Sequence, residues 1–176
     1  MKILLGVTGG IAAYKSCELC SLAIKDQHEI QVIQTHNSTR FIGTLTFEGL
    51  TGRPVLCDTF ENAMDHIAYA KWADIVIVAP LSANMLAKLA HGLCDDLLST
   101  TICATPLSTP IVLCPAMNTH MWENPITQRN IAILKETQRY SWVEPISKRL
   151  ACGDTGIGGL ASPSAILKHS VSLCDL

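Results

Sequence analysis

The sequence contains few charged residues. Asp, Glu, Lys and Arg make up 16% of its 176 residues, whereas hydrophobic residues make up 48%. A monomer with a fully solvated surface usually carries more charge, so we expect part of the surface to be buried in a homo-oligomer. The length is sufficient for one domain with a substantial core, and we expect residues 1–176 to form that domain.

Other absences exclude classes of partner. The formal net charge is -2 and no segment is densely basic, which argues against binding to nucleic acid. No apolar run approaches the roughly 20 residues that a membrane span needs, so we expect no membrane partner. A strand is predicted to begin within the first two residues, which leaves no room for a signal peptide.

The eight cysteines do not follow a disulfide or metal-site pattern. Their scatter through predicted strands and helices favours reduced, mostly buried thiols in a cytoplasmic compartment, and we expect no metal site. Cys17 and Cys20 have redox-motif spacing but fall within a helical pattern, so we interpret them as packing residues.

A strand-then-helix pattern, repeated about six times, predicts an α/β fold with a doubly wound parallel sheet. The expected strands cover 2–7, 29–34, 74–79, 110–113 and 140–143, with a possible short strand at 55–57. The expected helices cover 11–25, 39–51, 68–72, 85–90, 97–104, 125–137 and 163–173.

The sequence also lacks a dinucleotide fingerprint. Gly6, Gly9 and Gly10 follow or end the first strand, and a strand, a glycine turn and a helix can bind a phosphate through backbone N–H groups. Their spacing is not G-x-G-x-x-G, there is no P-loop lysine pattern, and the tip at 35–38 has no acid for a ribose diol. A mononucleotide phosphate is therefore favoured over NAD, although the tip could simply cap the next helix through Ser38.

Within the stretch 114–122, C-P-A-M-N-T-H-M-W, residues 115–122 are expected to form a loop at the carboxyl end of a strand, where open α/β sheets bind ligands. Met117, Met121 and Trp122 are unusual in a solvated loop, and they suit contact with a large flat ligand or another subunit. On spacing alone, packing in the core is an equally good interpretation. Asn118 offers an amide to a ligand.

Two further features are less specific. Residues 148–159 contain a cationic pair, a cysteine and four glycines within seven residues, so we predict a mobile flap over about 148–162 rather than a strand or helix. The alternative is a disordered surface loop. His66 precedes a central strand, and a lone histidine is more often a structural group than a catalyst.

Four motifs together resemble the homo-oligomeric flavin-containing cysteine decarboxylase family. They are G-G-I-A-A-Y-K at 9–15, His66 before W-A-D-I-V-I-V-A-P-L-S-A-N at 72–84, P-A-M-N-T-H-M-W at 115–122, and L-A-C-G-D-T-G-I-G at 150–158. The resemblance implies a flavodoxin-like, Rossmann-like fold with FMN at a subunit interface of a homotrimer or homododecamer. It also implies FMN-dependent decarboxylation of 4'-phosphopantothenoyl-L-cysteine to 4'-phosphopantetheine in coenzyme A biosynthesis, through a thioaldehyde and enethiol.

The resemblance also assigns residues. His66, Asn118 and Cys152 match the catalytic positions. The cofactor-binding positions are Gly9, Gly10, Ile11, Thr35, Asn37, Ser82, Ala83, Asn84, Met85 and Ala116. The substrate-binding positions are Asn118, Met121, Arg149, Leu150 and Ala151.

One segment departs from the family pattern. The family flap commonly reads G-x-G-R-M-x-E-P, whereas residues 156–163 read G-I-G-G-L-A-S-P, without the arginine and the acid. Two alternatives to the implied function are decarboxylation of a peptide's C-terminal cysteine and a non-enzymatic, phosphatase-inhibitory role. The chain could be a stand-alone enzyme or a domain of a fusion with a synthetase.

Overall fold

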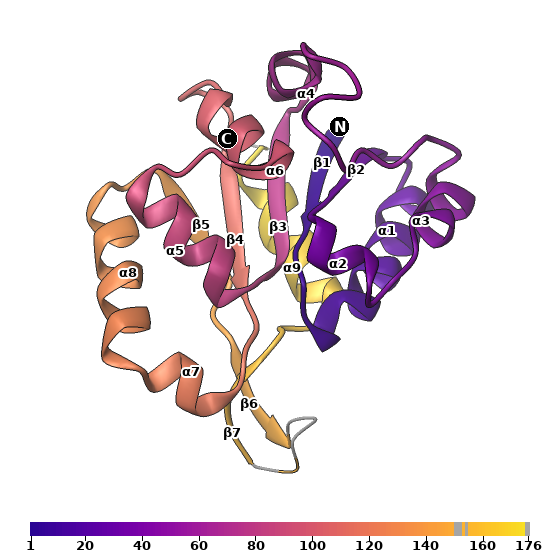
Figure 1. Cartoon of the computed structure of the whole chain (residues 1–176). Helices are drawn as coiled ribbons and strands as arrows, with labels where there is room; N and C mark the ends of the chain where they lie inside the picture. Colours follow the sequence, from indigo (N-terminus) through magenta and orange to yellow (C-terminus); the bar gives the residue numbers. More distant parts are fainter. Residues whose placement is uncertain (150–152, 154, 175–176) are drawn as a thin grey trace.

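The computed structural model describes residues 1–149, 153 and 155–174 (Figure 1). The strands are β1 (Lys2–Val7), β2 (Glu29–Gln34), β3 (Ile75–Leu81), β4 (Ile111–Pro115), β5 (Tyr140–Trp142), β6 (Ile146–Arg149) and β7 (Thr155–Gly159). The helices are η1 (Ile11–Ala13), α1 (Tyr14–Lys25), α2 (His36–Thr39), α3 (Thr44–Thr51), α4 (Asp65–Trp72), α5 (Ala83–His91), α6 (Leu97–Ala104), α7 (Thr119–Glu123), α8 (Pro125–Glu136) and α9 (Pro163–Ser172).

Five parallel strands form the central sheet in the order β2-β1-β3-β4-β5. Alternate residues of β1 and β3 pack into two separate cores, which explains why these strands are apolar throughout. One core lies against α1, α3 and α9, and the other lies against α5, α6 and α8. The prediction of a flavodoxin-like, doubly wound sheet is confirmed.

Local signals in the sequence set most helix boundaries. Asp96 forms a capping box with Ser99 at the start of α6, in which the side-chain oxygen of Asp96 accepts a 2.8 Å bond from Ser99 N–H. Asn124 and Ser162 cap α8 and α9, and a proline follows each of them at the first helical position. The predicted starts of these three helices are confirmed.

The prediction that 148–159 excludes strand structure is wrong. β6 and β7 pair antiparallel in a hairpin outside the main sheet, so the segment 140–143 is not the last strand. The glycines of β7 allow backbone to approach closely: a Cβ on Gly156 would lie 2.5 Å from Thr119 Oγ1, and one on Gly158 would lie 2.1 Å from the Met117 carbonyl oxygen. Gly158 also has φ +144°, which disfavours other residues.

Two smaller expectations need correction. Residues 119–123 form the short helix α7, so Met121 and Trp122 are helical rather than part of a loop. Ser38 does not cap a helix; it is buried within α2, and its hydroxyl donates to the carbonyl of Thr35. The polar tip of β2 therefore is not explained by capping through Ser38.

The cysteines are less buried than expected. Of the seven that the structure describes, Cys20 and Cys114 are buried, whereas Cys94, Cys103 and Cys174 are exposed. The exposed three lie at helix ends or in adjoining loops, where side chains leave the core. Within the described part of the chain, no helix combines the length and apolar character needed to cross a bilayer.

Candidate functional site

Two adjoining cavities lie where β1, β3 and β4 end. The larger has a volume of about 550 Å³ and reaches from the loop after β1 to the β6–β7 hairpin. The smaller, about 290 Å³, reaches toward the end of β2 and the start of α5. Both are lined by Gly9, Ser82, Ala83 and Met121, so they form one continuous candidate site. This is the position at which the order of a doubly wound sheet reverses.

Buried hydroxyl groups join the loops that carry the site. Thr8 Oγ1 donates to the carbonyl of Pro80 at 2.7 Å and accepts from Ser82 N–H at 2.8 Å. Ser16 Oγ donates to the carbonyl of Ala79 at 2.6 Å. These bonds hold the residue after β1 and the start of α1 against the end of β3, two segments more than 60 residues apart in sequence.

The smaller cavity has polar groups suited to an anion. A Cβ on Gly9 would lie 2.7 Å from Asn37 Cβ, so only glycine lets the two loops approach this closely. Thr35 Oγ1 is buried and has no hydrogen-bond partner among the described residues. Ser82 Oγ accepts from Met85 N–H at 3.3 Å, which caps α5 and still leaves the hydroxyl proton as a donor.

The structure brings most of the predicted site residues together. All of the predicted cofactor-binding residues line one cavity or both. Asn118, Met121 and Arg149, predicted to bind substrate, line the larger cavity. Leu150, Ala151 and Cys152 lie outside the described residues, between β6 and β7.

Asn118 is held in one orientation by the start of α7. Its Oδ1 accepts from His120 N–H at 2.8 Å as the cap of that helix. With the oxygen used in this way, Nδ2 is the donor end of the amide. The segment is held in turn by the hairpin, because Met117 N–H donates to the carbonyl of Gly158 at 2.9 Å.

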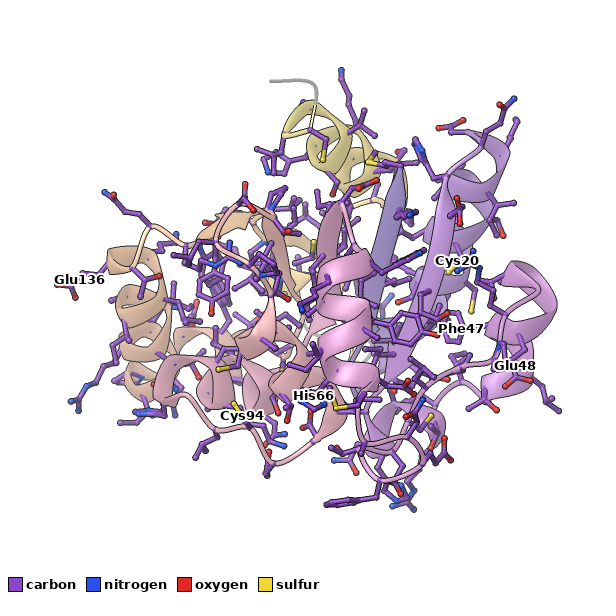
Figure 2. All side chains as sticks on the ribbon, turned by 90° about the horizontal axis from the view of Figure 1, so that it is seen from above. Cys20, Phe47, Glu48, His66, Cys94 and Glu136 are labelled. Atoms are coloured by element: carbon purple, nitrogen blue, oxygen red, sulfur yellow. The ribbon has the colours of Figure 1, made fainter. Side chains whose placement is uncertain are left out.

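The structure does not place His66 near Asn118 within one chain. It lines neither cavity, and it lies near the start of α4, which crosses the end of the sheet where β1 and β3 begin (Figures 1 and 2). The end of α4 is fixed there because Asp74 and Lys2 are joined by two hydrogen bonds, at 2.7 and 2.9 Å. His66 Nδ1 is buried, and no residue in the described ranges forms a hydrogen bond with it.

The sequence reasoning missed several residues of the larger cavity. Lys15, Lys148 and Gly159 are the most informative of them. Burial lowers the pKa of the partly buried Lys15, and the nearby ammonium of Lys148 lowers it further. Lys15 is the last residue of the motif at 9–15, and Lys148 belongs to the noted cationic pair, so both signals were present in the sequence.

A family model described as Flavoprotein matches residues 1–175. The chain belongs to the Flavoprotein family. It is 44% identical over 171 residues to a probable phosphopantothenoylcysteine decarboxylase of Streptococcus mutans, with 95% of each chain covered. It is 42% identical to a coenzyme A biosynthesis bifunctional protein CoaBC of Bacillus subtilis, with 95% of this chain covered. The chain spans only 41% of the length of that bifunctional relative.

Solved structures of similar proteins have the same fold. One is a mutant PPC decarboxylase complexed with pantothenoylaminoethenethiol, with a TM-score of 0.87, 36% identity, and coverage of 99% of this chain and 98% of that one. Another is the FMN-binding protein AtHal3, with a TM-score of 0.81, 38% identity, and coverage of 98% and 95%. The resemblance noted in the sequence is thereby confirmed at the level of the family.

Proposed function

We propose that this protein is a phosphopantothenoylcysteine decarboxylase, which uses FMN to convert 4'-phosphopantothenoyl-L-cysteine to 4'-phosphopantetheine and CO2. The observation that carries the proposal is that Asn118 and all of the predicted cofactor-binding residues line one continuous site. A relative named as a probable phosphopantothenoylcysteine decarboxylase, at 44% identity, and one named as a coenzyme A biosynthesis bifunctional protein, at 42%, support the same substrate. Free thiols at Cys17, Cys20, Cys57, Cys94, Cys103 and Cys114 support a cytoplasmic location.

The residues present fit FMN. The buried, unpartnered hydroxyl of Thr35 and the hydroxyl of Ser82 can donate to a phosphate in the smaller cavity. Ala83 and Ala116 have short side chains, and a Cβ on Gly10 would meet nothing within 4 Å, so a flat ring has room against the backbone. When bound, FMN supplies a two-electron acceptor and donor beside the substrate.

Each catalytic candidate then has a distinct task. Direct loss of CO2 from a cysteine carboxylate would leave an unstabilised carbanion, whereas a thioaldehyde next to that carbon can accept the electron pair. His66 acts as the base or electrostatic partner when the substrate thiol is oxidised. Asn118 Nδ2 donates to the departing carboxylate and orients it, and Cys152 returns a proton to carbon afterwards.

A complete site on this proposal needs a second copy of the chain. His66 lies at the opposite end of the sheet from Asn118, so the histidine must come from a neighbouring subunit of a homotrimer or homododecamer. Apolar residues are exposed on both surfaces that would meet: Phe60 is 91% and Met64 61% exposed before His66, and Ile11 is 62% and Met121 49% exposed at the cavity. Such exposed apolar groups mark interaction surfaces.

The proposal is tested by the flavin itself. Purified protein should contain FMN and be yellow, and it should bleach anaerobically when 4'-phosphopantothenoylcysteine is added and recover its colour as product forms. A panel containing a peptide with a C-terminal cysteine separates this activity from the related peptide reaction. Colourless protein that FMN does not reconstitute, or CO2 release that is indifferent to FMN, would overturn the proposal.

Replacing the proposed proton donor should stop the reaction part-way. A Cys152→Ser variant is expected to release CO2 in a single turnover but to leave the flavin bleached and the organic product oxidised. The reason is that an ordinary thiol, with a pKa of about 8.5, is a far better acid than a serine hydroxyl. Rapid-quench mass spectrometry together with flavin absorbance measures this, and normal turnover by the variant would remove Cys152 from the mechanism.

A further inference from the structure

One wall of the larger cavity carries positive charge that no acidic side chain pairs within the part of the chain that the structure describes. Lys15, Lys148 and Arg149 line this wall, and within the described residues none of the three takes part in an ion pair. Lys88, in the smaller cavity, is different because its ammonium lies 2.6 Å from both Asp95 and Asp96. The charge at the larger cavity is therefore available to an incoming anion.

The backbone after β7 holds the two lysines on the same wall. Lys15 Nζ donates to the carbonyl of Leu160 at 3.2 Å. Lys148 lies across the preceding residue, Gly159, since a Cβ built there would be 2.6 Å from Lys148 Cε and 2.8 Å from its Cδ and Cγ. The Lys148 side chain therefore occupies the space that a side chain on Gly159 would need.

The ammonium of Lys148 acts on Lys15. The pKa of Lys15 is lowered by burial first and by Lys148 second, while Glu18, one turn further along α1, acts in the opposite direction. Holding two like charges together is unfavourable unless an anion lies near both. A phosphate monoester, which carries about two negative charges at neutral pH, matches such a pair.

We propose that Lys15 and Lys148 bind the phosphate group of the substrate, at the end remote from its cysteine. This inference rests on the proposed function. The cofactor's own phosphate is better served by the smaller cavity, where Thr35 and Ser82 supply hydroxyls. Asn118 lines the same larger cavity as the lysines, so one extended molecule can reach both.

Calorimetry with two unreactive probes tests the site. The holoenzyme is titrated with 4'-phosphopantothenate and with pantothenate, which differ only in the phosphate. We expect Lys148→Gln and Lys15→Gln each to weaken binding of the phosphorylated probe about 10- to 100-fold, because each removes a charged hydrogen bond. Binding of the unphosphorylated probe should change by less than about threefold. Lys25→Gln, at the exposed end of α1, is the matched control and should bind both probes as wild type does.

A further variant, Gly159→Ala, keeps both lysine charges but displaces the ammonium of Lys148. Gly159→Ala places a methyl group where the aliphatic part of the Lys148 side chain lies. It should therefore weaken binding of the phosphorylated probe, as the two lysine variants do, although both lysines remain. In turnover, KM for the phosphorylated substrate should rise with little change in kcat, as expected when binding that is equal in ground and transition states is lost. The FMN content of every variant, read from absorbance, should equal that of the wild type.

Three results would overturn the assignment. Equal weakening of both probes would mean that the lysines act on structure rather than on phosphate. Loss of FMN from Lys15→Gln or Lys148→Gln would assign them to the cofactor's phosphate, and unchanged binding would exclude them altogether. If the wild type releases no CO2 from any substrate, the proposed function fails, yet the calorimetry still decides whether this wall binds a phosphate monoester.

Discussion

His66→Asn and Asn118→Asp subunits, each almost inactive alone, are expected to regain about one quarter of wild-type activity when mixed in equal amounts. Asn118→Asp places a second carboxylate against the departing one and should lower kcat about 100- to 1,000-fold. His66→Asn removes a base and should lower kcat by a similar factor. Both variants should retain FMN, because neither change removes a residue proposed to hold it.

The recovery follows from the distance between the two residues. If each site takes His66 from one subunit and Asn118 from another, random mixing leaves about a quarter of the sites with both groups intact. A mixture of wild type with the double variant provides the control. It should give about one quarter of wild-type activity for shared sites but about one half for sites within one chain.

The measurement is CO2 release after the two kinds of subunit are co-expressed in equal amounts and purified through one tag that both carry, so that mixed and unmixed oligomers are both kept. Activity that stays at the level of the separate variants would show that His66 and Asn118 do not meet across an interface. Each variant expressed alone and purified in parallel reports the background.

Gly158→Ala is expected to abolish most activity by separating the hairpin from the segment that carries Asn118. The added methyl group would lie 2.1 Å from the Met117 carbonyl oxygen, and φ of +144° is strained for alanine. The hairpin must move away, which breaks the 2.9 Å bond from Met117 N–H to the Gly158 carbonyl. A displacement of about 1 Å near a reacting group can cost about 100-fold in rate.

Gly52→Ala is the matched control for backbone strain. Gly52 has φ +68°, ends α3, and has no atom within 4 Å of a built Cβ. Both variants should lose about 1–3 kcal/mol of unfolding free energy from strain, as measured by denaturant titration. Only Gly158→Ala should also lose CO2 release, and near-normal turnover by that variant would show that hairpin docking is not needed.

Much of the fold was predictable because its signals are local. The apolar runs of β1 and β3 indicated strands buried on both faces, and Asp96, Asn124 and Ser162 marked helix starts within a residue or two. The cofactor-binding candidates could be named because their motifs follow the ends of strands, and parallel strands end at one edge of a sheet. None of this required knowledge of contacts between distant segments.

The hairpin was mispredicted for the opposite reason. Glycines at 156, 158 and 159 weaken a strand when considered alone, yet each one makes room for another segment: Thr119, Met117 and Lys148 respectively. Those partners lie 37, 41 and 11 residues away by number, so no local pattern shows them. Close approach between distant segments, rather than intrinsic propensity, explains this strand.

The sequence by itself determined the doubly wound sheet, the family and the groups available for chemistry, because periodicity, caps and motifs act over a few neighbouring residues. Only the tertiary structure decided where those groups meet. It places Asn118 in the cavity, sends His66 to the other end of the sheet with α4, and sets Lys15 beside Lys148. These positions depend on how helices cross the sheet and which loops touch, and packing of the whole chain sets both.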